Sequence, residues 1–340
     1  MRRSLPGATI IPVLAPVLVL MSCNVFDPVD LGSEDDLKSE FELVWRTFDR
    51  YYVNFHLSDA DWDALHAEYG ALAEQAESQA DIEAILFDMC AELEDPGVTV
   101  AGDSTHPLEV SPNYDMAVLM TYLEPQGFTW VHEGQWGWCM FGNTVYFLLE
   151  GFWVENIELD EVIESHPEIE EMIFDARMSE CETGGAPLGE ICRVFNAESV
   201  VGYFTISRSG PGHEDFCPLH PRIVSRSLDC FTGPVAVLIG ESNMRVSEQF
   251  ACMVSEVTNV TTMGDTTMRR PDFVMTYELP GIGGYTMPDS TIIRADSTTW
   301  VRQAGVPPDV FVDATEEDFA AGVDPVLEYA LEWAGETPIR

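Results

Sequence analysis

Apolar residues recur at every third or fourth position through three consecutive stretches between residues 37 and 97. This spacing places them on one face of a helix and predicts three amphipathic helices. The second helix is expected to start at a Ser58 cap, and Asp95-Pro96-Gly97 is expected to end the third. The predicted apolar faces are Leu37, Phe41, Val44, Trp45, Phe48, Tyr51 and Tyr52 in the first helix, Trp62, Leu65, Tyr69 and Leu72 in the second, and Ile82, Ile85, Leu86, Met89 and Leu93 in the third.

After residue 97 the pattern changes. Residues 98–141 are irregular and strand-rich, and they contain Trp130, Trp136 and Trp138. Beyond them, short apolar runs alternate with helical patterns, which predicts a mainly parallel sheet flanked by helices and hence an α/β fold. The predicted strands are 144–149, 172–175 and 235–239, and the predicted helices lie near 159–165, 188–195 and 245–257.

The N-terminal end has the pattern of an export signal. Arg2 and Arg3 precede an apolar run from Ile10 to Met21, which is too short to span a bilayer and ends at Ser22-Cys23. This ending resembles a bacterial lipobox, with Cys23 as the lipidated first residue of the mature chain; an ordinary signal peptide with a chance cysteine is the alternative. We therefore expect an exported bacterial lipoprotein, anchored to a membrane on its periplasmic or cell-surface side. The expected organisation is a signal peptide (1–22), an acidic tether (23–36), a helical subdomain (37–97) and a core domain (98–340).

Charge limits the classes of partner. The chain has 59 acidic and 16 basic residues, a formal net charge of −43 at pH 7. Such a field repels nucleic acid and anionic headgroups, so we expect neither as a partner; contact with a membrane is expected through the lipid anchor only. Lys38 is the only lysine.

Eight cysteines in an exported chain suggest disulfides. Without Cys23 an odd number remains, so at least one is free. The economical local pairs are Cys181 with Cys192 and Cys217 with Cys230, whereas Cys90 and Cys252 lie in apolar helical patterns and are expected to be buried thiols. Because no C-x-x-C pair occurs, we expect no metal, and no cofactor is expected either.

Seven motifs occur in a fixed order along residues 37–335, and together they resemble the tail-specific (C-terminal processing) serine peptidases, in their PDZ-less, tricorn-core-like branch. The resemblance implies a ClpP/crotonase-like core and, because too few residues precede the strand at 144–149, no PDZ domain. The motifs are FELVWRTFDRYYVNF, AELEDPGV (Ala91–Val98), NTVYFLLEGF (Asn143–Phe152), MIFDARMSECETGG (Met172–Gly185), GPVAVLIGESNMRVSEQFA (Gly233–Ala251), MGDTT (Met263–Thr267), and GVPPDVFV (Gly305–Val312) with GVDPVLEYAL (Gly322–Leu331).

The catalytic positions of this family are substituted. The resemblance places the nucleophilic serine three residues before Glu248, where this chain has Arg245. Arg270 stands at the lysine position of one family version, and Gly97 at the histidine position of the other. Arg302 stands where a supporting glutamate is expected. An arginine cannot accept a proton at neutral pH, because its pKa is ~12 or higher.

Two functions follow from the resemblance. The first is a degenerate peptidase homologue that acts as an exported, lipid-anchored binding or scaffold protein. The second is an active serine peptidase with a rearranged site, in which Ser247 (or, less favoured, Ser242) is the nucleophile and His213 or His220 lies in the preceding loop. The glycines of the oxyanion element, Gly184 and Gly185, are retained.

The arginines at the substituted positions allow two interpretations of the former catalytic site. Arg245, Arg270, the adjacent Arg269 and Arg302 would converge at the former catalytic site. Either they pair with nearby carboxylates and close it, or they form a pocket for a carboxylate ligand such as a peptide C-terminus or a fatty acid. The candidate pairing partners are Glu241, Glu248 and Asp265.

Lipidation of Cys23 is directly testable. In a host that processes lipoproteins, the wild-type chain is expected in the membrane fraction and Cys23→Ala in the soluble fraction, since the substitution removes the acylated thiol. Fractionation and mass spectrometry of the mature N-terminus measure this. A soluble wild-type chain would contradict the anchor.

Overall fold

The computed structural model describes residues 37–106, 113–132, 136–150, 159–178, 180–181, 198–227, 230–279, 281 and 283–336. Cys23, Gly184, Gly185 and Cys192 lie outside these residues, as do the predicted helix near 188–195 and the side chain of Cys181. Within the described ranges, no helix combines the length and apolar character needed to cross a bilayer.

The three N-terminal helices form as predicted, with one difference at their starts. They are α1 (Leu37–Tyr51), α2 (Trp62–Ala73) and α3 (Gln79–Ala91), with a 3₁₀ turn, η1 (Phe55–Leu57), after the first. The expected Ser58 cap is wrong: Asp61 caps α2 by accepting a hydrogen bond from the Ala64 amide, while the Ser58 hydroxyl accepts one from the Ala60 amide. Asp61 rather than Ser58 is the N-cap because it directly precedes the first helical residue, where its carboxylate reaches the free amides of the first turn.

A seven-stranded sheet forms the core, in the order β15-β12-β10-β6-β5-β4-β3. From β15 to β5 the strands are parallel, and β4 and β3 add an antiparallel edge. This confirms the expected mainly parallel core. The strands are β3 (Thr129–His132), β4 (Trp136–Phe141), β5 (Thr144–Leu149), β6 (Glu171–Asp175), β10 (Val235–Ile239), β12 (Val260–Gly264) and β15 (Val310–Phe311).

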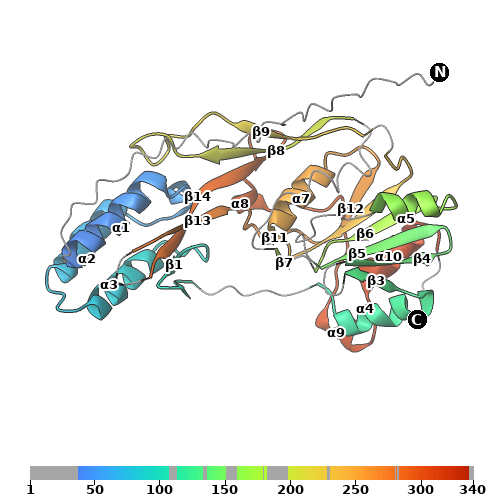
Figure 1. The fold of residues 1–340 in the computed structure, drawn as a ribbon, viewed down its shortest axis with the longest axis horizontal. Helices are drawn as coiled ribbons and strands as arrows, with labels where there is room; N and C mark the ends of the chain where they lie inside the picture. Colours follow the sequence, from blue (N-terminus) through green and yellow to red (C-terminus); the bar gives the residue numbers. More distant parts are fainter. Residues whose placement is uncertain are drawn as a thin grey trace, which may run out of the picture.

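Helices cover both faces of this sheet (Figure 1). Successive side chains of a strand point to opposite faces, so Val237 packs with α7 (Val246–Val254) and α5 (Leu159–Ser165), whereas Leu238 packs with α4 (Met116–Leu123) and α10 (Pro325–Trp333). Helix α4 lies in the segment that the sequence pattern described as irregular. Its apolar residues are continuous rather than periodic, so the pattern carried no helical signal.

A second sheet joins the helical end to the core. Its order is β2-β1-β14-β8-β9, and β13 also pairs with β14. The long strand β14 (Tyr285–Arg294) places Tyr285 among the N-terminal helices and Ile292 against α7, so one strand belongs to two hydrophobic cores (Figure 1). The other strands are β1 (Thr99–Val100), β2 (Asp103–Ser104), β8 (Val200–Ser207), β9 (His220–Val224) and β13 (Phe273–Tyr277), and the remaining short elements are η2 (Glu124–Gln126), β7 (Glu180–Cys181), β11 (Met244–Arg245), α8 (Val301–Ala304) and α9 (Glu316–Ala320).

The expected Cys217–Cys230 disulfide is not formed, and both residues are free thiols. Cys217 lies before β9, where its amide bonds to the Ser207 carbonyl, whereas Cys230 follows that strand. The extended strand separates the two cysteines, since each strand residue advances the chain by about 3.3 Å. Cys90 and Cys252 are buried free thiols, as predicted.

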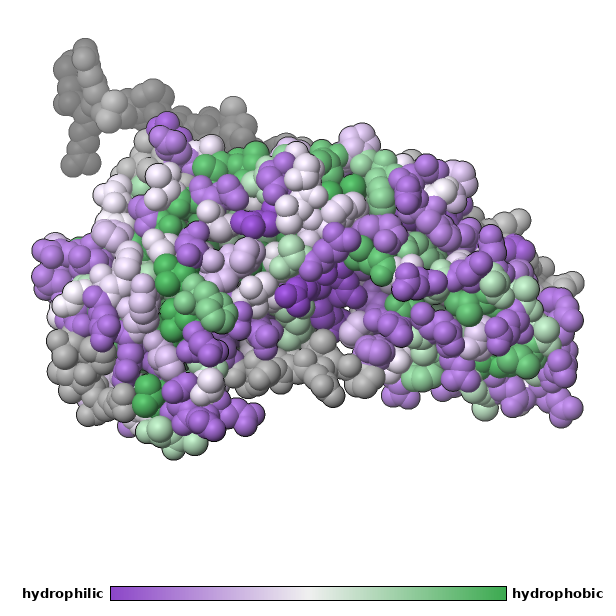
Figure 2. Space-filling view, turned by 180° about the vertical axis from the view of Figure 1, so that it is seen from behind, coloured by the Kyte–Doolittle hydropathy of each residue, from purple (hydrophilic) through white to green (hydrophobic). Residues whose placement is uncertain are grey.

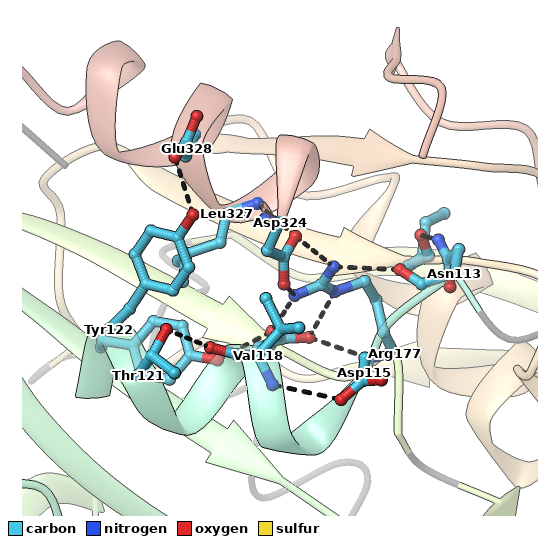
Figure 3. A network of polar contacts seen from close by, with 12 residues as sticks. Asn113, Asp115, Val118, Thr121, Tyr122, Arg177, Asp324, Leu327 and Glu328 are labelled. Atoms are coloured by element: carbon cyan, nitrogen blue, oxygen red, sulfur yellow. Dashed lines mark hydrogen bonds and ion pairs between the residues drawn. The ribbon is translucent and has the colours of Figure 1, made fainter. Parts of the chain in front are cut away.

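A buried ion cluster connects the sheet to the C-terminal helix (Figure 3). The Arg177 guanidinium donates to Asp175 at 2.7 and 3.0 Å and to Asp324 at 2.9 Å from each of two nitrogens. It also donates to the Asn113 carbonyl, and all three charged side chains are fully buried. Asp324 in turn caps α10 by accepting from the Leu327 amide. The cluster therefore fixes the end of β6 against the start of α10.

Replacing Arg177 tests this connection. Arg177→Met leaves two buried carboxylates without their counter-ion, so we expect a loss of about 3–5 kcal/mol in the free energy of unfolding. Urea denaturation measures it. As a matched control, Arg46→Met removes an exposed pair with Glu42 and should cost less than about 0.5 kcal/mol. Equal stability of the two variants would contradict the role of the cluster.

Candidate functional site

Arg245 occupies a tight connection between β10 and α7. It is the N-cap of α7 with φ 49° and ψ −112°, a backbone conformation that residues other than glycine rarely adopt. Its amide donates to the Arg270 carbonyl at 2.7 Å, and it pairs with Cys181 of β7 in a two-stranded ladder. The position that the resemblance assigns to the nucleophile thus lies in a strained strand-to-helix turn at the start of a helix, and its side chain is an arginine.

Asn243 stabilises this turn from inside. Its side-chain nitrogen donates to the Ala176 carbonyl at 2.7 Å, and its side-chain oxygen accepts from the Gly240 amide at 2.8 Å. The contact with Ala176 joins the turn to the residue that follows β6. The position of Arg245 is therefore set by the carboxyl ends of two adjacent parallel strands, where sites of α/β sheets usually form.

Glu248 connects α7 to the segment that carries Arg270. Its fully buried carboxylate accepts hydrogen bonds from the Thr267 hydroxyl at 2.5 Å and from the amides of Arg269 and Arg270 at 2.7 and 2.5 Å. Burial raises the pKa of Glu248 to about 8. Because this carboxylate binds backbone amides, it brings Arg270 beside Arg245 without forming an ion pair with either side chain.

Arg270 is a buried cation with no directly bonded counter-ion among the described residues. The residue is only 8% exposed, and within the described part of the chain its guanidinium makes no hydrogen bond or ion pair. Burial lowers the pKa of Arg270, and the nearby charges of Arg302 and Arg245 lower it further, whereas the carboxylates of Asp95 and Asp272 act in the opposite direction. A buried, hydrogen-bond-donating cation of this kind is costly unless an anion occupies the space beside it.

Arg302, by contrast, has its counter-ions. It lies 2.9 Å from Asp95 and 3.6 Å from Asp272, both of which are buried. The amide nitrogen of Asn54 donates to both carboxylates, at 3.2 and 3.1 Å, and the Tyr52 hydroxyl donates to Asp95 at 2.8 Å. Burial raises the pKa of Asp272 to about 6. This acidic cluster (Tyr52, Asn54, Asp95, Asp272 and Arg302) joins the N-terminal helices to the core.

Two further positions that the sequence assigned to the site, Arg269 and Gly97, lie beside this cluster. Arg269 is exposed, and its carbonyl accepts from Arg302 at 3.3 Å. Gly97 is buried, and its amide donates to Asp95 at 2.8 Å. A Cβ at position 97 would lie 2.9 Å from the Pro288 ring, so a histidine there requires Pro288 to move. The structure therefore brings Arg245, Arg270 and Arg302 together, and it leaves no room for a base at position 97.

Neither fallback serine has a histidine partner. Ser247 is buried and donates its hydroxyl to the Met244 carbonyl at 2.7 Å, while the buried Ser242 hydroxyl has no hydrogen-bond partner in the structure. His213 contacts Asp49 at 2.9 Å and stacks on Phe55 instead.

The sequence motifs did not identify most of the acidic cluster. Asn54 and Asp95 lie in quoted motifs that assign them no site role, since the pattern predicts only a helix end at Asp95, and Asp272 belongs to no motif quoted above. Their only signal is polarity beside apolar residues, as in the segment Tyr51–Phe55. Such a signal shows that a polar side chain is present, but not which distant residue it bonds.

Glu248 should make stability depend on pH. Its folded-state pKa of about 8 lies above its ordinary value of 4.5, so the folded chain retains a proton that the unfolded chain releases. Its contribution is fully present below pH 4.5 and is lost as pH rises toward 8. Glu248→Gln cannot titrate, so the stability of wild type relative to this variant should fall between pH 5 and pH 8. Urea titrations across that range measure the difference, and a constant or rising difference contradicts the assignment.

Comparison with known proteins agrees with this fold. The sequence profile of the tricorn protease C1 domain matches residues 33–91. A candidate peptidase from Parabacteroides merdae superposes with a TM-score of 0.77 at 23% identity, covering 88% of this chain and 97% of its own. A photosystem II D1 C-terminal processing protease gives 0.59 at 13% identity, covering 83% and 94%. A lipoprotein from Streptococcus agalactiae gives 0.56 at 9% identity, covering 88% and 96%.

No curated protein sequence matches the chain significantly. At these identities the structural neighbours establish the fold, and they confirm the fold that the ordered motifs implied. The chain therefore has the fold of the tail-specific peptidases, with an N-terminal segment that matches the tricorn protease C1 domain.

Proposed function

We propose that this chain is a catalytically silent homologue of the tail-specific peptidases that binds a carboxylate ligand at the former catalytic site. The observation that carries the proposal is Arg270, a residue 8% exposed beside Arg245, whose guanidinium makes no hydrogen bond or ion pair among the described residues. The expected ligand is a peptide C-terminus or a fatty-acid-like carboxylate.

The loss of catalysis rests on the side chains at the family positions. Arg245 has no nucleophilic atom at neutral pH, and Arg270 cannot act as a base. Position 97 carries a glycine, which supplies no base, and a Cβ there would lie 2.9 Å from the Pro288 ring. The rearranged alternative lacks support, since the Ser247 hydroxyl is bonded to a backbone carbonyl and Ser242 has no base beside it.

Carboxylate binding rests on charge and geometry. A guanidinium presents parallel N–H groups that match the two oxygens of a carboxylate. Helix α7 has nine residues, and its N-terminal end adds the positive end of the helix dipole beside Arg245. Two of the three carboxylates expected to neutralise these arginines bond elsewhere: Glu248 binds amides and Asp265 accepts from the Thr266 amide.

The cellular location belongs to the same proposal. We infer from the Ile10–Cys23 pattern that the chain is exported and anchored by lipid on Cys23. One protein that shares the fold is itself described as a lipoprotein, which supports this inference. Binding without cleavage at a membrane surface would make the chain a capture or scaffold protein.

Calorimetric titration tests the proposal. An N-acetylated apolar tetrapeptide with a free C-terminus should bind, and its C-terminal amide should bind about 10-fold or more weakly, because each charge-assisted hydrogen bond contributes about 1.5–3 kcal/mol. Arg270→Gln should remove the preference for the acid, whereas Arg50→Gln on α1 should keep it. Mass spectrometry of the recovered peptide should show it intact.

Two results would reject the proposal. Equal affinity for acid and amide, or an unchanged preference in Arg270→Gln, would reject the carboxylate site. Cleavage of the peptide that disappears in Ser247→Ala would instead establish a rearranged peptidase.

A further inference from the structure

A polar cleft, lined in part by Arg302, lies next to the carboxylate site proposed above. It has a volume of about 810 Å³ and lies between the N-terminal helices and α8. Figure 2 shows that hydrophilic side chains gather near the middle of this face of the molecule, between its two lobes. The residues lining the cleft are Tyr52, Asn54, His56, Leu57, Ser58, Asp59, Ala60, Glu92, Leu93, Glu94, Asp95, Arg302 and Gln303.

Asn54 contributes an acceptor that lacks a donor. The residue is 1% exposed, and its amide nitrogen donates to both Asp95 and Asp272. These two bonds fix the orientation of the amide, because carboxylates only accept. The remaining atom, Oδ1, is buried and has no hydrogen-bond partner in the structure. A side chain this buried is expected to have all its polar atoms bonded, so a donor is missing here.

His56 contributes a second acceptor. Its Nδ1 lies 3.2 Å from the Val53 carbonyl, and because a carbonyl only accepts, Nδ1 carries the hydrogen. Burial lowers the pKa of His56, which favours the neutral ring with a lone pair on Nε2. That atom is also buried and without a partner. Two residues that line the cleft therefore each have an unsatisfied atom that accepts hydrogen bonds and cannot donate.

The net charge of the cleft also favours a ligand that is positively charged. Arg302 is the one cation in the acidic cluster, and it faces the two carboxylates of Asp95 and Asp272. The cluster thus keeps an excess negative charge when both acids are ionised. Exposed carboxylates add to it at the rim of the cleft, from Asp59, Glu92 and Glu94.

We propose that this cleft binds a protonated primary amine or a guanidinium, held by the Asn54 and His56 acceptors and by the surrounding carboxylates. The group carries only donors and a positive charge, which complements the two unsatisfied acceptors and the carboxylates among the lining residues. Two sources supply this chemistry: the side chain of a lysine or arginine in a peptide, and a free alkyl diamine. The site goes beyond the carboxylate site proposed above, since Arg245 and Arg270 take no part in it.

Binding of small cations tests the inference. Nα-acetyl-lysine amide carries the ammonium without a carboxylate, and Nα-acetyl-norleucine amide is its uncharged apolar match. In calorimetric titrations the lysine probe should bind about 10-fold or more tightly than the norleucine probe, because only the former provides charge-assisted donors. Cadaverine is the third probe, and tighter binding of cadaverine than of the lysine probe identifies the free diamine as the source.

Charge-matched variants separate this site from the general acidity of the chain. Glu92→Gln/Glu94→Gln should weaken the lysine probe about fivefold, as expected for two partly screened ion pairs. Glu316→Gln/Glu317→Gln on α9 removes the same charge elsewhere and should change affinity less than about twofold. Thermal unfolding verifies that both variants are folded.

Three results would overturn the inference: no saturable binding of either cation to wild type, equal affinity for the lysine and norleucine probes, or equal weakening in the two double variants. None of the probes carries a carboxylate, so these results leave the carboxylate site untouched. Conversely, a failure of the apolar peptide acid to bind says nothing about the amine cleft.

Discussion

The arrangement of this molecule depends on a fully buried guanidinium. Arg177 lies between Asp175 at the end of β6 and Asp324 at the start of α10, so one side chain connects the centre of the sheet to the C-terminal helix (Figure 3). A buried charge is tolerated only when its partners are fixed in place, and each partner here is fixed by a further bond. Tyr146 donates to Asp175, and Asp324 caps α10. The carboxyl ends of the parallel strands are thereby held where the site forms.

The other buried ion cluster lies at the position where the proposed function requires the catalytic base to be lost. Arg302 satisfies Asp95 and Asp272, and Asp95 also binds the amide of Gly97, where the family has a base. Restoring a single catalytic side chain would therefore disturb a bonded network. The strained turn at Arg245 survives because it depends on backbone and Asn243 contacts rather than on the side chain at the nucleophile position.

The two proposed sites have opposite preferences, and the division follows from how the charges pair. Glu248 bonds to backbone amides, so the charge of the buried Arg270 remains available for an anion. In the neighbouring acidic cluster, the two carboxylates of Asp95 and Asp272 share the single cation Arg302. Acceptors there remain available for a cation. An excess of 59 acidic over 16 basic residues cannot by itself predict this division, because the local count of partners decides it.

By itself the sequence predicted the three N-terminal helices and several core strands, and it singled out the positions expected to be substituted. Helical periodicity predicted α1 and α3, and short apolar runs predicted β5 and β10, because local burial patterns reflect which face meets the core. The ordered motifs predicted the fold and identified Arg245 and Arg270. Only the tertiary structure decided which charges pair. Asp95, Asp272 and Arg302 are distant in sequence, and so are Arg177 and Asp324; a hydrogen bond depends on separations of about 3 Å that only the folded chain sets. For the same reason, the chain folds Cys217 and Cys230 onto opposite ends of a strand although they are near in sequence.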